Sequence, residues 1–222
     1  MRDRGSPSEV VLSELYVSLQ GEGTRAGRRC AFVRLTGCGL RCRWCDTAYA
    51  FEGGERRPVA EVVAEVLSLG VPLVLITGGE PLEQPGCFAL AEALCDAGFE
   101  LLVETGGHVP TRALDPRAVR ILDVKCPGSG MQRRNHLPNL GDLRPCDEVK
   151  FVVADREDFD YARARIEEYR LDALGCPLLF SPAHGELEPA RLAAWLQELP
   201  FPQARLNLQL HKILWPERAR GV

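Results

Sequence analysis

A chain of 222 residues is long enough for one α/β domain and too short for two large ones. Hydrophobic residues make up 45% of it and charged residues 26%, a balance typical of a folded domain and outside the disordered range. The net charge of −4 argues against a protein whose main task is to neutralise a phosphate backbone. We therefore expect a small-molecule ligand and no nucleic acid.

Neither end of the sequence suggests a membrane. The first ten residues lack the apolar run of a signal peptide, and no stretch approaches 18 consecutive apolar residues. We expect a cytoplasmic protein without membrane contact. In that setting the nine cysteines, an odd number, indicate thiols or metal ligands before they indicate disulfides.

Helices and strands alternate along the chain. Apolar segments at 10–18 and 30–35 predict the first two strands, and helical periodicity then alternates with short apolar runs. The predicted helices cover 59–69, 87–97, 111–119, 158–169 and 189–199, and the further strands cover 71–76, 101–104, 121–124, 149–153, 177–180 and 206–210. Such alternation implies parallel pairing with right-handed crossovers, so the sequence predicts an α/β fold, a partial (open) TIM-like barrel of about six parallel strands.

One segment interrupts this pattern inside a predicted single domain of residues 1–222. Residues 126–147 are rich in Gly, Pro, Asn and Arg and are too polar and broken for a helix. Because a loop of this length in a compact domain usually has a function, we expect it to form a lid or a wall of an active site.

Three cysteines are the most informative feature of the sequence. Cys38, Cys42 and Cys45 are close together, and no fourth cysteine follows nearby. Structural zinc sites and electron-transfer clusters normally use four protein ligands, so three thiolates leave one position open to another molecule. A zinc site completed by a distant residue, or three unrelated buried cysteines, are the alternatives. The flanking glycines and arginines do not form an apolar stripe, which favours a reactive metal loop.

Polar residues and glycines also gather where the predicted strands end, as reacting groups do in barrels of parallel strands. Gly78 and Gly79 follow an apolar strand and leave backbone groups uncovered for a ligand, although a tight turn is the alternative. Glu104 ends another strand and could accept hydrogen bonds from ribose hydroxyls, or cap a helix. Lys125 and residues 181–184 lie at equivalent places.

The cysteine spacing resembles that of the radical S-adenosylmethionine (SAM) enzymes, in which the open iron chelates SAM and an electron from the cluster generates a 5′-deoxyadenosyl radical. Segments along nearly the whole chain resemble one family, the 7-carboxy-7-deazaguanine synthases (QueE). These segments are 18–23, 32–38, 44–47, 77–81, 104–107 and 209–212. The resemblance implies a lyase that converts 6-carboxy-5,6,7,8-tetrahydropterin into 7-carboxy-7-deazaguanine with loss of ammonia, in queuosine and 7-deazapurine biosynthesis.

The resemblance also implies three cofactors and their residues. Cys38, Cys42 and Cys45 would hold a [4Fe-4S] cluster, and Thr47 would bind Mg²⁺. The substrate residues would be Leu19, Gln20, Gly21, Arg34 and Thr77, where an arginine fork suits a planar carboxylate. The SAM residues would be Gly78, Gly79, Glu80, Glu104, Asp123, Val124, Lys125, Ser181, Pro182, Ala183 and His184. A substrate contact by Pro216 is left open because the chain continues past it to Val222.

The resemblance further implies a homodimer and an external reductant, flavodoxin-like or other. Two different functions stay open from the residues alone. A glycyl-radical-enzyme activase would use the same cluster chemistry on a protein partner, and a zinc or iron–sulfur binding module would not be catalytic. The short chain and the opening around Gln20 and Glu22 favour the small pterin substrate.

Overall fold

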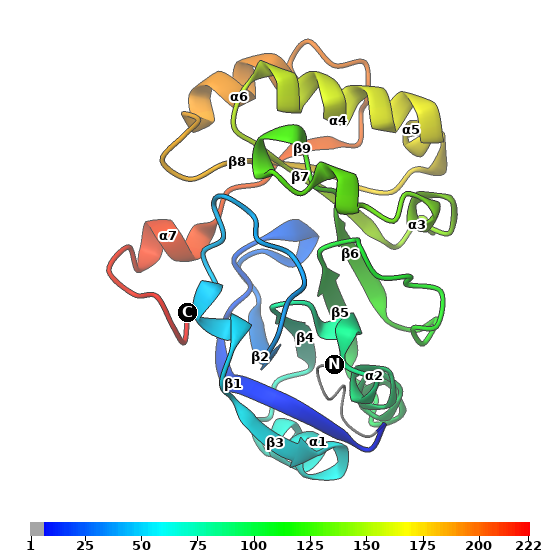
Figure 1. Ribbon diagram of the computed structural model, residues 1–222, viewed down its shortest axis with the longest axis vertical. Helices are drawn as coiled ribbons and strands as arrows, with labels where there is room; N and C mark the ends of the chain where they lie inside the picture. The colour runs from blue at the N-terminus through cyan, green and yellow to red at the C-terminus, as the bar shows by residue number, and fades with distance from the viewer. Residues whose placement is uncertain (1–6) are drawn as a thin grey trace.

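The computed structural model describes residues 7–222, so part of the N-terminal segment considered above for a signal peptide lies outside the described residues. One nine-stranded sheet, in the order β3-β1-β2-β4-β5-β6-β7-β8-β9, runs through it (Figure 1). The strands are β1 (Glu9–Leu19), β2 (Arg29–Leu35), β3 (Glu55–Pro58), β4 (Leu73–Gly78), β5 (Glu100–Thr105), β6 (Val119–Asp123), β7 (Glu148–Val153), β8 (Leu178–Pro182) and β9 (Ala204–Leu206).

The sheet is parallel from β2 to β9, and only β1 pairs antiparallel, with β2 and with β3. Because β3 and β9 are its two ends and do not pair with each other, the sheet stays open. The prediction of an open α/β sheet of mainly parallel strands is therefore confirmed. β1 and β3 form an antiparallel extension that the sequence analysis did not foresee.

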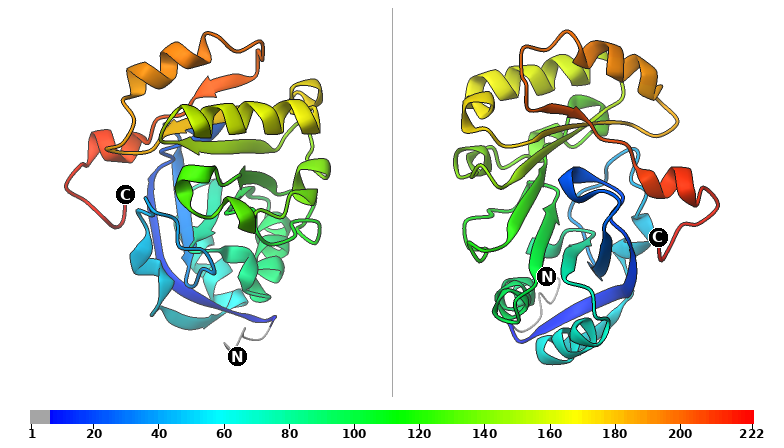
Figure 2. Two further views of the ribbon diagram at one scale, coloured as in Figure 1. Left: turned by 45° about the horizontal axis from the view of Figure 1, so that its top comes forward. Right: turned by 180° about the vertical axis from the view of Figure 1, so that it is seen from behind.

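Helices cover one face of this sheet. α1 and α2 lie against its first half, and α4 and α6 lie against its second half (Figures 1 and 2). The α-helices are α1 (Val59–Ser68), α2 (Gly86–Asp96), α3 (Pro138–Gly141), α4 (Arg156–Tyr169), α5 (Leu171–Leu174), α6 (Pro189–Leu196) and α7 (Leu210–Leu214). The short 3-10 helices are η1 (Gly23–Arg25), η2 (Ala48–Phe51), η3 (Pro81–Glu83), η4 (Pro127–Ser129) and η5 (Gln132–Arg134). No helix in residues 7–222 is long and apolar enough to cross a bilayer.

The two faces of the sheet differ because side chains alternate along each strand. The helix-covered face is mainly apolar and includes Val103, Phe151 and Phe180, with the buried and paired Arg120 as an exception. The opposite face is apolar only toward the amino ends of the strands, where Leu75 and Leu102 are buried together. Toward the carboxyl ends the same face carries charged and polar side chains. These are Arg34, Thr77, Glu104, Asp123, Lys150 and Ser181.

Two predicted elements are wrong. Residues 111–118 form turns and bends and not a helix, and Val119 begins β6. The Asp115 side chain accepts from the Arg117 N–H and competes with helical bonding, and Pro116 disfavours helical geometry before it. Residues 206–210 are not a strand: β9 ends at Leu206, and α7 begins at Leu210. The Asn207 side chain there turns inward to bind the Gly23 N–H and Ser181.

The loop predicted at 126–147 contains three short helical turns, η4, η5 and α3. It is held in place by side-chain bonds to main-chain groups. Asn135 bonds the backbone of Lys125, and Asn139 accepts from Thr111 N–H. The segment lacks a long regular element, as the sequence predicts, but it is built into the fold.

A buried ion network joins the start of β6 to the segment before β7. Asp147, with no exposed side-chain surface, accepts from the guanidinium groups of Arg120 and Arg144 at 2.6 Å each. Burial raises the pKa of Asp147, but the two arginines outweigh it and the pKa is lowered.

We expect Asp147→Asn to lower the free energy of unfolding by about 3 kcal/mol at pH 7, because two arginines lose their buried counter-ion. Since the folded pKa lies below the unfolded one, the carboxylate stabilises the fold above the unfolded pKa, and this contribution disappears as the pH falls through the folded pKa. Urea unfolding at pH 7 and at acid pH measures both effects. Asp160→Asn, which removes a surface partner of Arg156, should cost less than about 1 kcal/mol.

Candidate active site

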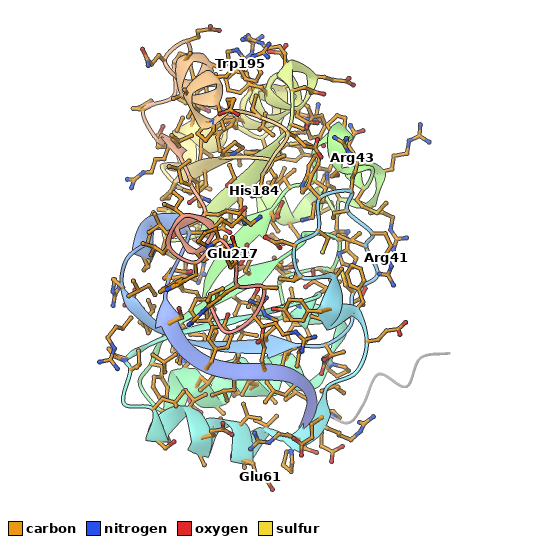
Figure 3. The ribbon with its side chains drawn as sticks, turned by 90° about the vertical axis from the view of Figure 1, so that its left-hand side faces the viewer. Arg41, Arg43, Glu61, His184, Trp195 and Glu217 are labelled. Carbon is orange, nitrogen blue, oxygen red and sulfur yellow. The ribbon has the colours of Figure 1, made fainter. Side chains whose placement is uncertain are left out.

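A cavity of about 510 Å³ lies at the carboxyl ends of the parallel strands. Figure 3 shows His184, which follows β8, and Glu217, which follows α7, near the middle of this side, with Arg41 of the cysteine loop at the edge. Most residues that the sequence analysis assigned to the site line the cavity. They are Leu19, Gln20, Gly21, Arg34, Cys38, Cys42, Cys45, Thr47, Thr77, Gly78, Gly79, Glu104, Asp123, Lys125, Ser181, Pro182 and His184.

Three assigned residues are not in the lining: Glu80, Val124 and Ala183. Val124, which directly follows β6, points to the helix-covered side of the sheet and joins the second hydrophobic core. Ala183, which directly follows β8, is buried. The Glu80 carboxylate accepts from Thr105 at 2.8 Å and from the Gly106 N–H at 2.8 Å. Glu80 therefore supports the loop after β5 with its side chain instead of facing the cavity.

The three cysteines lie on the loop that leaves β2, and neighbouring groups fix its path. The Gly37 N–H donates to Ala50 at 2.8 Å, and the Gly39 N–H donates to the Glu83 carboxylate at 3.0 Å. The Arg41 guanidinium donates to the carbonyls of Cys38 and Leu40 and stacks on Phe51, 4.1 Å from the ring centre. This bonding brings all three thiols to the cavity from one side.

Three thiols on one loop suit a multi-metal cluster, in which each thiolate binds a different iron and one iron is left for another ligand. A single zinc ion would need all three sulfurs at about 2.3 Å from one centre. No group of three His, Cys, Asp or Glu side chains that could hold one metal ion is found among the described residues. Burial raises the pKa of Cys38 to about 11, so binding iron there must displace a proton.

The Gly78–Gly79 pair is required by backbone contact with the cysteine loop. The Gly79 N–H donates to Leu35 at 3.0 Å, and the Glu80 N–H donates to Gly37 at 2.7 Å. A Cβ on Gly78 would lie 2.1 Å from the Leu35 oxygen, at a φ of +146° that favours glycine, and one on Gly79 would lie 2.1 Å from the Gly37 oxygen. The glycines thus position the metal loop as well as leaving backbone open to a ligand.

Charged groups on the inner face are paired. Asp123 and Lys125 form an ion pair of 2.8 Å, and the buried Lys150 bonds both Glu22 and Glu104. Burial and neighbouring Glu22 raise the pKa of Glu104, with Lys150 opposing them. Lys150 was not among the site residues predicted from the sequence. Its position between Val149 and Phe151 in an apolar strand is nevertheless a signal of a polar group on the inner face.

Arg34 lies on β2 within a polar cluster. Its Nε donates to Glu14 at 2.8 Å and its Nη2 donates to the Tyr16 hydroxyl at 3.2 Å, while the Tyr49 hydroxyl also donates to Glu14 at 2.6 Å. Burial lowers the pKa of Arg34, but the tyrosines and Glu14 outweigh it, so the group stays charged. The C-terminal segment closes over this cluster: Tyr16 donates to Val222, and Arg220 stacks on Tyr49 at 4.4 Å.

The lining includes further residues that the sequence analysis did not assign to the site. These are Glu22, Phe32, Leu40, Trp44, Asp46, Tyr49, Phe51, Leu75, Thr105, Gly106, Lys150, Val152, Gln209, His211, Lys212, Trp215, Pro216, Arg218, Ala219 and Val222. Several lie on the segment after β9. That segment reaches the cavity only through the tertiary fold, so no local sequence pattern marks its residues as part of the site. His211 is seated by Gly21, where a Cβ would lie 2.7 Å from its Nδ1, and burial lowers the pKa of His211.

Open parallel α/β architecture and a three-cysteine loop at the strand ends define a radical SAM enzyme, and residues 32–124 match the Radical SAM superfamily model. The chain is 45% identical to the 7-carboxy-7-deazaguanine synthase of Chlorobaculum tepidum, covering 95% of this chain and 96% of that protein. It is 40% identical to that of Koribacter versatilis, covering 96% and 100%. The chain belongs to the 7-carboxy-7-deazaguanine synthase family.

Solved structures agree on the fold. The crystal structure of QueE from Escherichia coli matches with a TM-score of 0.71 at 23% identity, covering 90% of this chain and 94% of that one. Streptococcus suis SuiB bound to S-adenosylmethionine matches with a TM-score of 0.56 at 14% identity, covering 82% and 48%. The chain is thus a radical SAM enzyme that uses a [4Fe-4S] cluster and SAM and acts on a small molecule. The relatives do not support an activase or a non-catalytic module.

We expect Gly79→Ala to lower the free energy of unfolding by about 1–3 kcal/mol, because the added methyl meets the Gly37 backbone and not a flexible side chain. The displaced cysteine loop should also bind less iron after anaerobic reconstitution. Denaturant unfolding and iron analysis measure the two effects. Gly141→Ala adds a methyl where no atom lies within 4 Å and serves as the control. Equal iron content in both variants would contradict this role of Gly79.

Proposed function

We propose that the cavity at the strand ends is where this chain converts 6-carboxy-5,6,7,8-tetrahydropterin into 7-carboxy-7-deazaguanine with release of ammonia. The observation that carries the proposal is that the three thiols, the glycines after β4 and Arg34 line one cavity of about 510 Å³. That volume is in the ordinary range for small-molecule sites. The cavity is lined by groups suited to bind a cluster, a nucleoside and a carboxylate.

Cys38, Cys42 and Cys45 would hold the cluster, whose fourth iron is left to SAM. When bound and reduced, the cluster and SAM supply a radical that removes a hydrogen atom from the substrate. The residues of the chain itself would bind and orient SAM and the substrate. The backbone of Gly78 and Gly79 would receive the methionyl end of SAM, and the wall of polar residues would receive its nucleoside. That wall consists of Glu104, Asp123, Lys125, Ser181, Pro182 and His184.

The substrate would lie between the N-terminal turn and β2. Leu19, Gln20 and Gly21 form one side of the cavity, and Arg34 and Thr77 are neighbours in register on β2 and β4. A guanidinium can bind a carboxylate through two parallel hydrogen bonds, which would orient the substrate as well as attract it. Glu14 and Tyr16 hold Arg34 in place for this task.

Thr47 would take part in binding Mg²⁺. Its hydroxyl lies at the cavity, and Asp46 beside it lines the same space. Burial raises the pKa of Asp46, but Lys212 and other partners outweigh it and bring the pKa to about 2, so a carboxylate is present at neutral pH. Hydroxyl and carboxylate oxygens suit this hard cation, which also keeps part of its water shell.

The proposal extends to the protein's partners and to its location in the cell. We propose a homodimer in the cytoplasm that accepts electrons from a flavodoxin-like or other reductant. Arg41 of the cysteine loop is exposed and donates to backbone carbonyls, so its positive charge is open to an acidic electron donor. We also propose that residues 126–147 act as a lid or wall of the active site within the single domain, since the Arg43 N–H donates to Ser129 and its Nε donates to Gly128.

The test is turnover by anaerobically reconstituted protein. We expect about four irons per chain, SAM cleavage on reduction, and 7-carboxy-7-deazaguanine formed from carboxytetrahydropterin in the presence of Mg²⁺. Mass spectrometry and ultraviolet absorbance identify the product. Cys42→Ala removes one cluster ligand and should abolish both SAM cleavage and product.

Cys146→Ala is the matched control, because Cys146 is exposed and outside the cavity lining, and it should leave both activities unchanged. SAM cleavage by the wild type without any deazaguanine product would refute the proposed substrate. Product formation by Cys42→Ala at the wild-type rate would refute the proposed cluster site.

We expect Arg34→Lys to lower kcat/KM for carboxytetrahydropterin at least about tenfold, mainly by raising KM, because an ammonium cannot present two parallel donors to a planar carboxylate while it also bonds Glu14 and Tyr16. Steady-state kinetics at saturating SAM measure the effect. Arg29→Lys on the exposed start of the same strand is the control and should stay within about twofold. An unchanged KM in Arg34→Lys would remove Arg34 from the substrate site.

A further inference from the structure

Lysine is rare in this chain and is confined to the cavity lining. Of the 27 basic residues, 24 are arginines, and the three lysines are Lys125, Lys150 and Lys212. All three line the cavity. Each pairs with a carboxylate there, whereas the ion pairs on the outer surface use arginine, as on α4. The ammonium groups of this chain are therefore confined to the cavity, where they lie beside the guanidinium of Arg34.

Lys150 has the most connected position of the three. Its Nζ lies 2.5 Å from Oε2 of Glu22 and 2.9 Å from Oε1 of Glu104, and its side chain is 7% exposed. Burial lowers the pKa of Lys150, but Glu104 and Glu22 outweigh it, so the pKa lies well above its usual value and the group is charged. One buried cation thus pairs with two carboxylates from different parts of the chain.

The stem of Lys150 spans a neighbouring strand. Lys150 is on β7 and Glu104 is on β5, with β6 between them, so the side chains start about 10 Å apart across the sheet. Glu22 comes from the turn after β1, where Asn207 and Gln209 also donate to its carboxylate at 3.1 and 2.9 Å. A flexible four-carbon stem with three rotating donors can satisfy both oxygens, and a planar guanidinium fork cannot rotate to do so.

The two carboxylates border different ligands in the proposed function. Glu104 belongs to the wall assigned to the SAM nucleoside, and Glu22 follows directly on Leu19, Gln20 and Gly21 of the substrate side. Without Lys150, Glu104 would lose the ammonium that pairs with it, and Glu22 would keep only its amide donors, Asn207 and Gln209. The ammonium therefore sets the directions of the two carboxylates relative to each other.

We infer that Lys150 is a positioning residue that aims Glu104 at SAM and Glu22 at the substrate, so that one ammonium orders both halves of the active site. The inference depends on the proposed function for the identity of the two ligands. It assigns Lys150 no contact with the reacting atoms. Its effect on SAM is exerted through Glu104 and its effect on the substrate through Glu22.

The test measures SAM binding to the reconstituted, oxidised enzyme by calorimetry, without turnover. Lys150→Met should raise the Kd for SAM at least about tenfold and, in separate kinetics, raise the KM for carboxytetrahydropterin. Lys150→Arg keeps the positive charge and should retain the melting temperature within a few degrees, yet still bind SAM several-fold more weakly. Arg117→Met, which loses an exposed ion pair with Asp96 and Asp115, should bind SAM as the wild type does.

A double-mutant cycle separates positioning from general damage. Glu104→Gln should weaken SAM binding, and adding Lys150→Met to it should change the SAM Kd by less than about threefold, because the residue through which Lys150 acts is already neutral. Fully additive losses, or wild-type SAM binding by Lys150→Met or Lys150→Arg, would overturn the inference. A wild type that binds SAM with this pattern but makes no deazaguanine would instead refute the proposed substrate.

Discussion

The backbone contact between the cysteine loop and the strand end after β4 is the constraint on which the site depends. Two hydrogen bonds, from Gly79 to Leu35 and from Glu80 to Gly37, join the loop to the sheet at a separation that no side chain can enter. Burying these polar groups is favourable only because they are paired with each other. The thiols are therefore positioned by the central parallel strands, although they belong to a loop.

The inner face of the sheet carries charge near the site. Toward the carboxyl ends of β5, β6 and β7 lie Glu104, Asp123 and Lys150, on the face whose apolar core includes Leu75, Leu102 and Ile121. Buried ions cost free energy unless they are paired with good geometry, and each of these charges is paired with another. Glu22 and Lys125 complete the set. The pairing keeps donors and acceptors fixed for ligands before any ligand arrives.

The sequence was sufficient for the architecture where local pattern and global fold agree. Alternating apolar strands and amphipathic helices predict the parallel sheet, and the rule that sites form at strand ends predicts where the cavity lies. The pattern was insufficient where particular side-chain bonds decide. The Asp115 side chain bonds the nearby Arg117 N–H and, with Pro116, overrides an apparent helix, and Asn207 ends β9 early because its side chain binds Gly23 across the molecule. Glu80 was predicted to face SAM, but its carboxylate is held by Thr105, a partner that spacing alone does not reveal.

The two halves of the cavity are built from different parts of the chain, and this division separates chemistry from selectivity. The cluster loop, the glycines after β4 and the ends of β5 and β6 are consecutive units of the central sheet. The other half is assembled from the turn after β1 and the segment after β9, where Gly21 seats His211 and Tyr16 bonds Val222. Changes in these peripheral segments can reshape the substrate side, while the hydrogen bonds from Gly79 and Glu80 still hold the cysteine loop to the sheet. Glu22, tied to Asn207 on one side and to Lys150 on the other, is where the two halves meet.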